Sequence, residues 1–74
     1  MKHQEVIPMP HLLSNNLIKL RKKKSLTQKE VASRIDIKVR TYQAYEERRC
    51  EPSMMILFKL KVLYSLDSVE QLFY

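Results

Sequence analysis

The chain has 74 residues, with 14 Lys or Arg against 8 Asp or Glu and a net charge of +6. This length allows one domain with a small hydrophobic core, for which dimerisation is a common source of extra stability. No apolar run is long enough to cross a membrane, and the start of the chain lacks the pattern of a signal peptide. The one cysteine, Cys50, cannot form an intramolecular disulfide, which favours a reducing, cytoplasmic setting.

The positive charge is concentrated in the first two-thirds of the chain. Residues 1–49 contain 12 Lys or Arg and 5 Asp or Glu, whereas residues 50–74 contain 2 and 3. A basic front favours a polyanionic partner such as nucleic acid, and a nearly neutral, apolar back favours packing or self-association.

The N-terminal third is predicted to contain an arm and one helix. Pro8 and Pro10 oppose a helix, so we expect residues 1–11 to form a flexible N-terminal arm. Leu13, Leu17 and Leu20 recur at helical spacing and predict a helix over about 12–23. The folded domain is therefore expected to cover residues 12–74.

A second helix is predicted to begin at Thr27. Thr27 and Glu30 have the spacing of a capping box, in which each side chain bonds a backbone N–H of the other residue. Val31, Ala32 and Ile35 supply its apolar face, and the next two residues interrupt the pattern.

The remaining elements are three further short helices. A third helix is predicted over about 39–47, with Tyr42 and Tyr45 on its inner side. Pro52 stops it from continuing, and Ser53 can cap a fourth helix over about 54–64. The apolar face of that helix is expected to be Met54, Leu57, Leu60, Val62 and Leu63, and a fifth helix at about 68–73 contributes Val69, Leu72 and Phe73. No strand pattern competes, so the fold class is all-α, with five short helices.

The second and third predicted helices are separated by a tight turn, and the small side chain of Ala32 suits their close approach. One helix of such a pair can lie across DNA phosphates while the next enters the major groove, whose width of roughly 12 Å admits a helix. Gln28, at the start of the first, is placed to bond a phosphate.

Residues 38–44 begin the second helix of this pair and contain no acidic residue. Arg40 can donate to guanine O6 and N7, and Gln43 can pair with an adenine edge. Val39 or Ala44 can contact a thymine methyl group. This segment is therefore the predicted base-reading surface.

Residues 12–73 resemble the helix-turn-helix domain of the Cro/repressor-like (Xre) transcription regulators. The resemblance rests on NLIKLRKKKSLTQKEVASRI, RTYQAYEE, EPSMMILFKL and SVEQLF, which follow in the family's order and spacing. It implies a compact five-helix, lambda-repressor-like bundle. It also implies a sequence-specific regulator, a repressor or mixed regulator, that binds an inverted-repeat operator as a homodimer.

The resemblance assigns roles to particular residues. Thr27 and Gln28 match the family's Ser/Thr–Gln pair, in which the Gln contacts a phosphate. Arg21 and Glu46 match a buried ion pair that fixes the geometry of the first and third helices. Residues 48–49 match a loop that approaches the DNA backbone or minor groove.

Three positions depart from the family pattern. Asp36 replaces the glycine of the turn and is expected to tolerate the left-handed conformation at a modest cost. Arg48 replaces the loop glycine after the third helix, where it adds a charge near DNA and is expected to strain the backbone. Lys38 replaces the usual Ser cap and is expected to exchange the cap for a phosphate contact.

The residue types and the family resemblance together predict the following contacts. The phosphate-binding set is Thr27, Gln28, Lys38, Thr41, Tyr42, Arg48 and Arg49, and the base-reading set is Val39, Arg40, Gln43 and Ala44. The expected dimer interface is Met55, Phe58, Leu66, Val69, Phe73 and Tyr74. Lys19, Lys22, Lys23 and Lys24 are expected to form a solvated basic face, of which at most two side chains touch phosphate.

No catalytic residues, metal ligands, cofactor or small-molecule ligand are expected, so the chain is not predicted to be an enzyme. Within the DNA-binding class, a regulator of a restriction–modification cassette and an antitoxin both remain open, in a prokaryotic or phage-like, nucleoid-associated context. The alternative class is a protein-interaction module or antitoxin of the same fold with weak or no DNA binding. A basic helix on a membrane surface is a weaker alternative, because residues 12–24 contain no aromatic residue.

Overall fold

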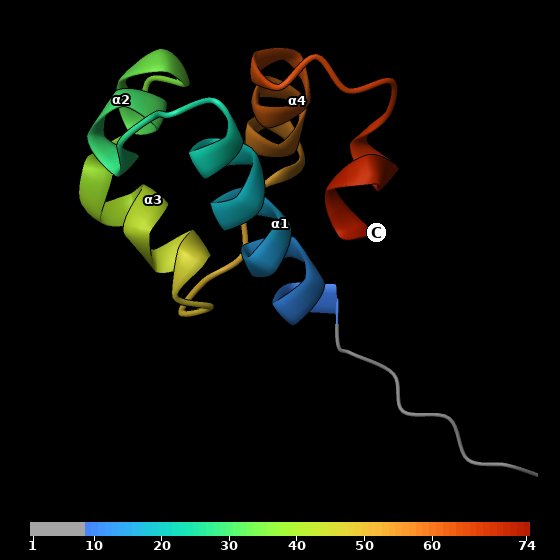
Figure 1. The fold of residues 1–74 in the computed structure, drawn as a ribbon. Coiled ribbons are helices and arrows are strands. Elements are labelled where there is room, and N and C mark those ends of the chain that lie inside the picture. Colours follow the sequence, from blue (N-terminus) through green and yellow to red (C-terminus); the bar gives the residue numbers. More distant parts are fainter. Residues whose placement is uncertain (1–8) are drawn as a thin grey trace, which may run out of the picture.

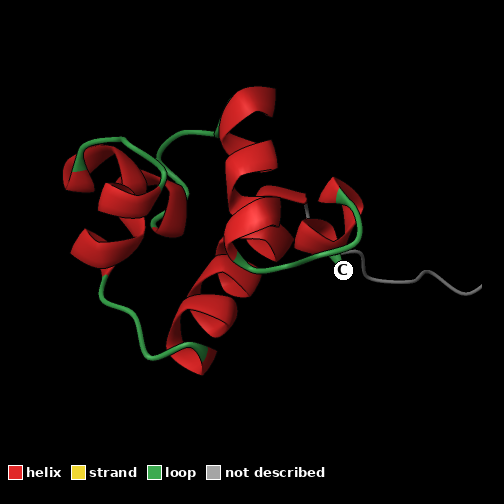
Figure 2. Ribbon diagram, turned by 90° about the horizontal axis from the view of Figure 1, so that it is seen from above, coloured by secondary structure: helices red, strands yellow, loops and turns green. Residues whose placement is uncertain are grey.

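The computed structural model describes the backbone of residues 9–74 and the side chains from Leu12 onward. Its helices are α1 (Met9–Lys23), α2 (Gln28–Arg34), α3 (Val39–Glu46) and α4 (Met54–Leu63), followed by the 3-10 helix η1 (Val69–Phe73). Figure 1 shows α2 and α3 on one side of α1, with α4 and the C-terminal segment on the other. Short loops join these helices, and the described residues contain no strand (Figure 2). The predicted all-α class is confirmed.

Two predicted elements differ from the observed ones. The predicted fifth helix is a 3-10 helix of five residues, and Ser68 makes no side-chain cap bond to it. A segment of five residues is too short for a stable α-helix, and its backbone N–H groups form the tighter hydrogen bonds of a 3-10 helix instead. Residues 9–74 therefore form four α-helices rather than five.

The first helix begins earlier than predicted. α1 starts at Met9 rather than at residue 12, and Pro10 lies in its first turn. Proline is tolerated there because its missing N–H would have no partner inside the helix. The remainder of the predicted arm, residues 1–8, lies outside the described residues.

The core lies where α1 packs against the other helices. Its fully buried side chains include Leu17 of α1, Val31 of α2, Tyr42 of α3, Leu60 of α4 and Leu72 of η1. Each element thus contributes a large side chain to one cluster. Burial of this kind is the main stabilising contribution in a chain of this size.

α4 presents an outer face that the sequence pattern did not predict. Met54 and Val62 were expected in the core but are 61% and 71% exposed. Val62 lies two residues from both Leu60 and Tyr64, which are buried, so it falls on the opposite side of the helix. Met54 precedes the half-exposed Phe58 by four residues, so the two side chains lie on the same side of α4. We call Met54, Met55, Phe58 and Val62 the α4 apolar stripe.

The helix starts follow the predicted capping pattern. Thr27 Oγ1 accepts from Glu30 N at 3.0 Å, and Thr27 N donates to Glu30 Oε1 at 2.8 Å, which completes the capping box of α2. Ser53 Oγ accepts from Ile56 N at 3.3 Å at the start of α4. Such caps stabilise a helix by about 1 kcal/mol.

All four α-helices end in the same backbone arrangement. Ser25, Asp36, Arg48 and Ser65 have φ values of 56°, 58°, 62° and 55°, in the left-handed region. The residue after each of them donates back to a carbonyl five positions earlier, as in Ile37 N to Ala32 O at 2.9 Å. This is the Schellman motif, which usually places glycine at the left-handed position. The chain contains no glycine, so each helix end forms without the residue that adopts this conformation most easily.

Two side chains tie distant elements together. Asn16 Nδ2 donates to the carbonyl oxygens of Leu72 and Tyr74, each at 2.8 Å, and joins α1 to η1. Lys59 Nζ donates to Ile35 O at 3.2 Å, at the last turn of α2. A cation is favourable at a helix C-terminus, so Lys59 fixes α4 against the turn between α2 and α3.

Candidate nucleic-acid interface

The turn between α2 and α3 brings the two helices close together. Ala32 is buried with 2% exposure, as its small size predicted. Asp36 adopts the left-handed conformation that the turn requires, with φ at 58°. The departure from glycine at Asp36 is therefore compatible with the turn.

The first turn of α3 is the part of the helix most open to solvent. Lys38, Val39 and Arg40 are exposed, whereas Tyr42, Ala44 and Tyr45 are buried. Lys38 makes no side-chain cap bond, so the first backbone N–H groups of α3 are left without a side-chain partner. The exposed end therefore combines backbone donors, two cations and one apolar side chain.

Two residues of the predicted contact sets are placed inside the protein. Tyr42 has 0% exposure and packs edge-on against Tyr45, with ring centroids 6.2 Å apart, so the prediction that it reaches a phosphate is wrong. Burial raises the pKa of the Tyr42 hydroxyl. Ala44 is 7% exposed, and its carbonyl oxygen accepts from Arg49 N at 2.9 Å at the end of α3. Its predicted contact with a base is also wrong.

The predicted ion pair joins α1 to α3. Arg21 Nε donates to Glu46 Oε2 at 2.7 Å, and Arg21 Nη2 donates to Glu46 Oε1 at 3.2 Å. Arg21 Nη1 also donates to Leu26 O at 3.1 Å, which fixes the loop before α2. Side-chain exposure is 14% for Arg21 and 4% for Glu46, so the pair is largely shielded from water.

The charged state of Glu46 is stabilised by its partners. Burial opposes the charge, but the hydrogen bonds from Arg21 and Gln28 and the positive charge of Arg21 outweigh that effect. The pKa of Glu46 is therefore lowered from its usual value. The carboxylate remains an acceptor for both donors near neutral pH.

Gln28 and Gln43 extend this network to the surface. Gln28 Nε2 donates to Glu46 Oε1 at 2.9 Å, and Gln28 Oε1 accepts from Gln43 Nε2 at 3.2 Å. Both glutamines are half-exposed. Gln28 thus lies between the ion pair and Gln43 of α3. This bond was not predicted from the sequence, because the two residues are fifteen positions apart.

The other predicted phosphate contacts lie at the surface in different settings. Thr27 is exposed, and its hydroxyl oxygen is the acceptor of the capping box. Thr41 is half-buried in the first turn of α3. Arg48 is exposed in the left-handed conformation, and Arg49 Nε donates to Glu47 Oε1 at 2.7 Å in a surface ion pair. A surface pair of this kind contributes little stability, so Arg49 can exchange its partner.

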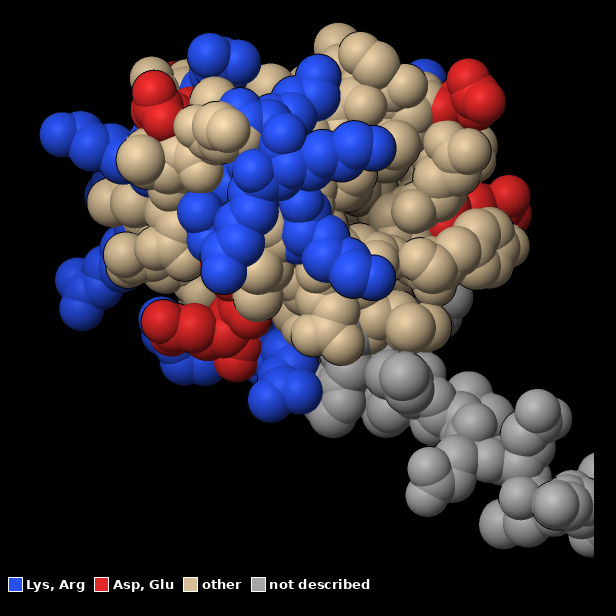
Figure 3. All heavy atoms as spheres, in the orientation of Figure 1, with Lys and Arg blue, Asp and Glu red and all other residues tan. Residues whose placement is uncertain are grey.

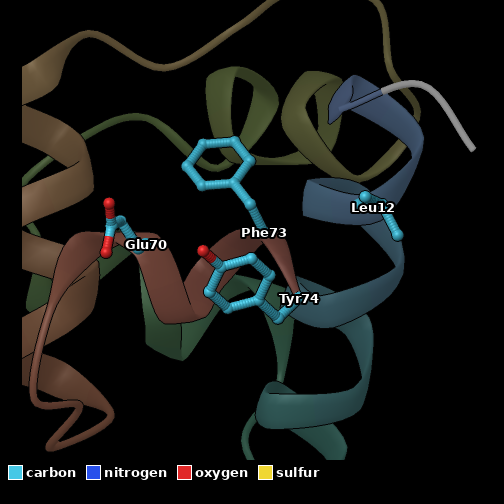
Figure 4. Close-up of a pocket in the computed structure, with 4 residues that line it drawn as sticks. All are labelled: Leu12, Glu70, Phe73 and Tyr74. Carbon is cyan, nitrogen blue, oxygen red and sulfur yellow. The ribbon is translucent and has the colours of Figure 1, made fainter.

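The predicted dimer residues do not all share one exposed surface. Met55, Phe58 and Tyr74 are exposed, whereas Leu66, Val69 and Phe73 are half-buried against the chain's own core. Figure 4 shows Leu12 and Phe73 beside Tyr74 and Glu70, where α1 meets η1. These four residues line a hollow of about 250 Å³.

The surface is strongly basic on the face shown in Figure 3, where Lys and Arg side chains gather over the C-terminal half of α1. Acidic side chains lie mostly at the margins of this view. Within residues 9–74, no helix has the length and apolar character needed to span a membrane.

Comparison with known proteins identifies the arrangement. A family model described as helix-turn-helix matches residues 17–66, more than half of the chain. The match covers α2, α3, α4 and the turns between them. No curated protein and no solved structure matches the chain.

Proposed function

Because the chain belongs to the Cro/C1-type (Xre-like) helix-turn-helix family of DNA-binding domains, we propose that it is a sequence-specific transcriptional regulator. α3 enters the major groove with its first turn. The observation that carries this proposal is the placement of Lys38, Val39 and Arg40 at the most exposed part of α3, its N-terminal end. The buried remainder of the helix fixes its position against α1 and α2.

Three side chains are proposed to recognise bases. Arg40 presents a guanidinium that matches guanine O6 and N7, and exposed Val39 presents methyl groups to a thymine methyl. Gln43 follows Arg40 by three residues, so both lie on one side of α3. One amide hydrogen of Gln43 bonds Gln28, which leaves one donor and the carbonyl acceptor for an adenine edge.

The phosphate contacts are proposed to surround this helix. Lys38 and Thr41 lie in its first turn, Thr27 precedes α2, and Arg48 and Arg49 follow α3. Gln28 retains one amide hydrogen beyond its bond to Glu46 and donates it to a phosphate. These contacts orient the protein on the duplex, and the base contacts supply specificity.

The protein is proposed to act as a homodimer on an inverted-repeat operator, as a repressor or mixed regulator in the cytoplasm of a prokaryotic or phage-like system. A two-fold dimer places its two recognition helices about one helical turn apart along the duplex. The exposed apolar side chains at the C-terminal side, Met55, Phe58 and Tyr74, support self-association there. The other proposed interface residues, Leu66, Val69 and Phe73, are half-buried against the core.

The experiment that tests the proposal is selection of binding sites from a random duplex library at about 150 mM salt, where non-specific phosphate binding is weak. We expect an enriched inverted repeat. A folded, helical chain that enriches no sequence would contradict the proposal. It would favour a protein-interaction module, such as an antitoxin, for which the α4 apolar stripe is the candidate surface.

A further inference from the structure

A second basic surface lies on α1, outside the helix-turn-helix. Lys19, Lys22, Lys23 and Lys24 are all exposed, and none of them pairs with a carboxylate within the described residues. Cations are favourable at the C-terminus of a helix, but the dipole is equivalent to only about half an elementary charge. The helix dipole therefore does not by itself account for four neighbouring lysines. We call these residues the α1 lysine face.

Two side chains of the α1 lysine face, Lys19 and Lys23, are directed away from α3. Arg21 lies on the side of α1 that meets α3, because it bonds Glu46. Lys19 and Lys23 each lie two residues from Arg21, which places them about 160° from it around the helix axis. Asn16 lies about one turn before Lys19 and two turns before Lys23, and it bonds the C-terminal segment. Lys19 and Lys23 therefore lie on the side of α1 opposite to α3.

A shallow hollow lies beside the α1 lysine face. It has a volume of about 270 Å³ and is lined by Asn16, Lys19, Leu20, Lys23, Gln71 and Tyr74. Gln71 Oε1 accepts from Asp67 N at 2.6 Å, so the Gln71 amide presents its NH2 group as the remaining donor. Two ammonium groups, one amide donor and one phenol make this a lining for anions. Leu20 is the one aliphatic side chain in it.

The lysines suit a phosphate backbone better than a peptide. An ammonium group is a hydrated point charge that contacts phosphates without a fixed orientation. Lys19 and Lys23 are about 6 Å apart along the helix axis. Each DNA strand carries a phosphate about every 3.4 Å of duplex axis, so the pair spans roughly two successive phosphates.

We propose that the α1 lysine face binds the phosphate backbone of a second DNA segment while α3 occupies the operator. The proposal rests on the proposed function, since it requires α3 to be engaged with a first duplex. It revises the expectation that these lysines form only a solvated surface. The protein would then bring two stretches of duplex together.

The test is a two-colour binding experiment. The full-length protein is saturated with a labelled operator duplex, and a second labelled duplex without the operator is added at about 50 mM salt and again at about 200 mM. We expect the wild type to capture the second duplex at low salt and to release it at high salt. The variant Lys19→Gln/Lys23→Gln should lower capture by roughly tenfold or more, because two phosphate contacts are lost. Its operator affinity should remain within about twofold of wild type.

The control is Arg34→Gln/Lys61→Gln, which removes the same charge from the end of α2 and from α4. We expect this control to capture the second duplex as the wild type does. Three outcomes would overturn the proposal: no capture by the wild type, equal loss in both variants, or displacement of the second duplex by polyglutamate at equal charge concentration. The label on the operator duplex reports operator binding independently of the second duplex. Failure of the proposed function would appear there as loss of operator binding.

Discussion

Gln43 Nε2 donates to Gln28 Oε1 at 3.2 Å, while Gln28 Nε2 donates to the buried Glu46 carboxylate at 2.9 Å. The orientation of the Gln43 amide is therefore set by Gln28, which is itself held by the buried Glu46 carboxylate. A neutral amide held in this way has one defined donor and one defined acceptor for a base.

The first prediction concerns this chain of hydrogen bonds. Gln28→Met should reduce the preference for adenine at the base pair that Gln43 contacts, because Gln43 loses the acceptor that orients it. In a Gln43→Met background the same change should cost less, with a coupling energy of roughly 0.5–3 kcal/mol. Binding titrations of operator variants with the wild type, the two single variants and the double variant measure this coupling energy. Equal losses on every sequence in both backgrounds would instead limit Gln28 to a phosphate contact.

The second prediction concerns Arg40. Arg40→Ala should lose about 1–3 kcal/mol of discrimination at one base pair and little at the others, because a bidentate contact to guanine is removed. Lys38→Ala is the matched comparison in the same turn, and it should weaken binding to all sequences alike. Affinities for single-base operator variants decide between the two behaviours. If both substitutions weaken every sequence equally, Arg40 does not recognise a base.

The third prediction is a pH dependence of stability. The folded-state pKa of Glu46 is lowered, so its contribution is fully present above the unfolded-state pKa and is lost as pH falls through the folded value. The free energy of unfolding should therefore decline below about pH 5. The pKa of Glu30 is also lowered, first by its hydrogen bond with the Thr27 backbone, so the measurement is made in Glu30→Gln, which keeps the capping box.

Urea unfolding between pH 3 and pH 7 checks this dependence. In the Glu30→Gln background, the further change Glu46→Gln should flatten the profile and lower stability at neutral pH, because the Arg21 ion pair is lost. Glu47→Gln, at an exposed surface pair, should leave the profile unchanged. An unflattened profile in the Glu46 variant would show that its carboxylate gains nothing from folding.

The fourth prediction concerns a left-handed helix end. Arg48→Gly should raise the free energy of unfolding by about 0.5–1 kcal/mol, because glycine adopts positive φ without the steric cost of a Cβ atom. Ser68→Gly is the control. Its φ is −151°, an extended conformation, so glycine there gains nothing and adds freedom to the unfolded chain. Denaturant midpoints compare the two variants, and a destabilised Arg48→Gly would refute the steric argument.

The fifth prediction concerns self-association. Phe58→Glu should convert the proposed homodimer to a monomer without unfolding it, because the Phe58 side chain is half-exposed in the single chain. Lys61→Glu, on the same helix, should leave the dimer intact. Sedimentation gives the mass of each variant, and circular dichroism shows whether the helices are retained. A wild type that sediments as a monomer at all concentrations would contradict the proposed dimer.

Much of the fold could be predicted from local pattern. The helix starts at Thr27 and Ser53 and the inward positions Leu17 and Val31 follow from capping and periodicity, which depend on neighbouring residues alone. The start of α1 was missed because Pro10 reads as a breaker, although in a first turn it is compatible with a helix. The burial of Tyr42 and the exposure of Val62 depend on which helices surround them.

The candidate site was predictable in outline but not in its internal connections. The first turn of α3 was identified from residue types, and the pairing of Arg21 with Glu46 from the family pattern. The bond between Gln28 and Gln43 and the contact of Lys59 with Ile35 O join residues far apart in sequence. Each depends on the final distance between two helices, which the spacing of residues along one helix does not determine.

The four left-handed helix ends also bear on how this protein can change its target sequence. Each position is one substitution from a glycine, and Ser25 and Ser65 lie outside the first turn of α3 that is proposed to recognise bases. Independent stabilising changes at separate sites add nearly fully. A lineage can therefore gain stability at the helix ends and then tolerate destabilising exchanges among the residues that contact DNA. The absence of glycine leaves this capacity unused in the present sequence.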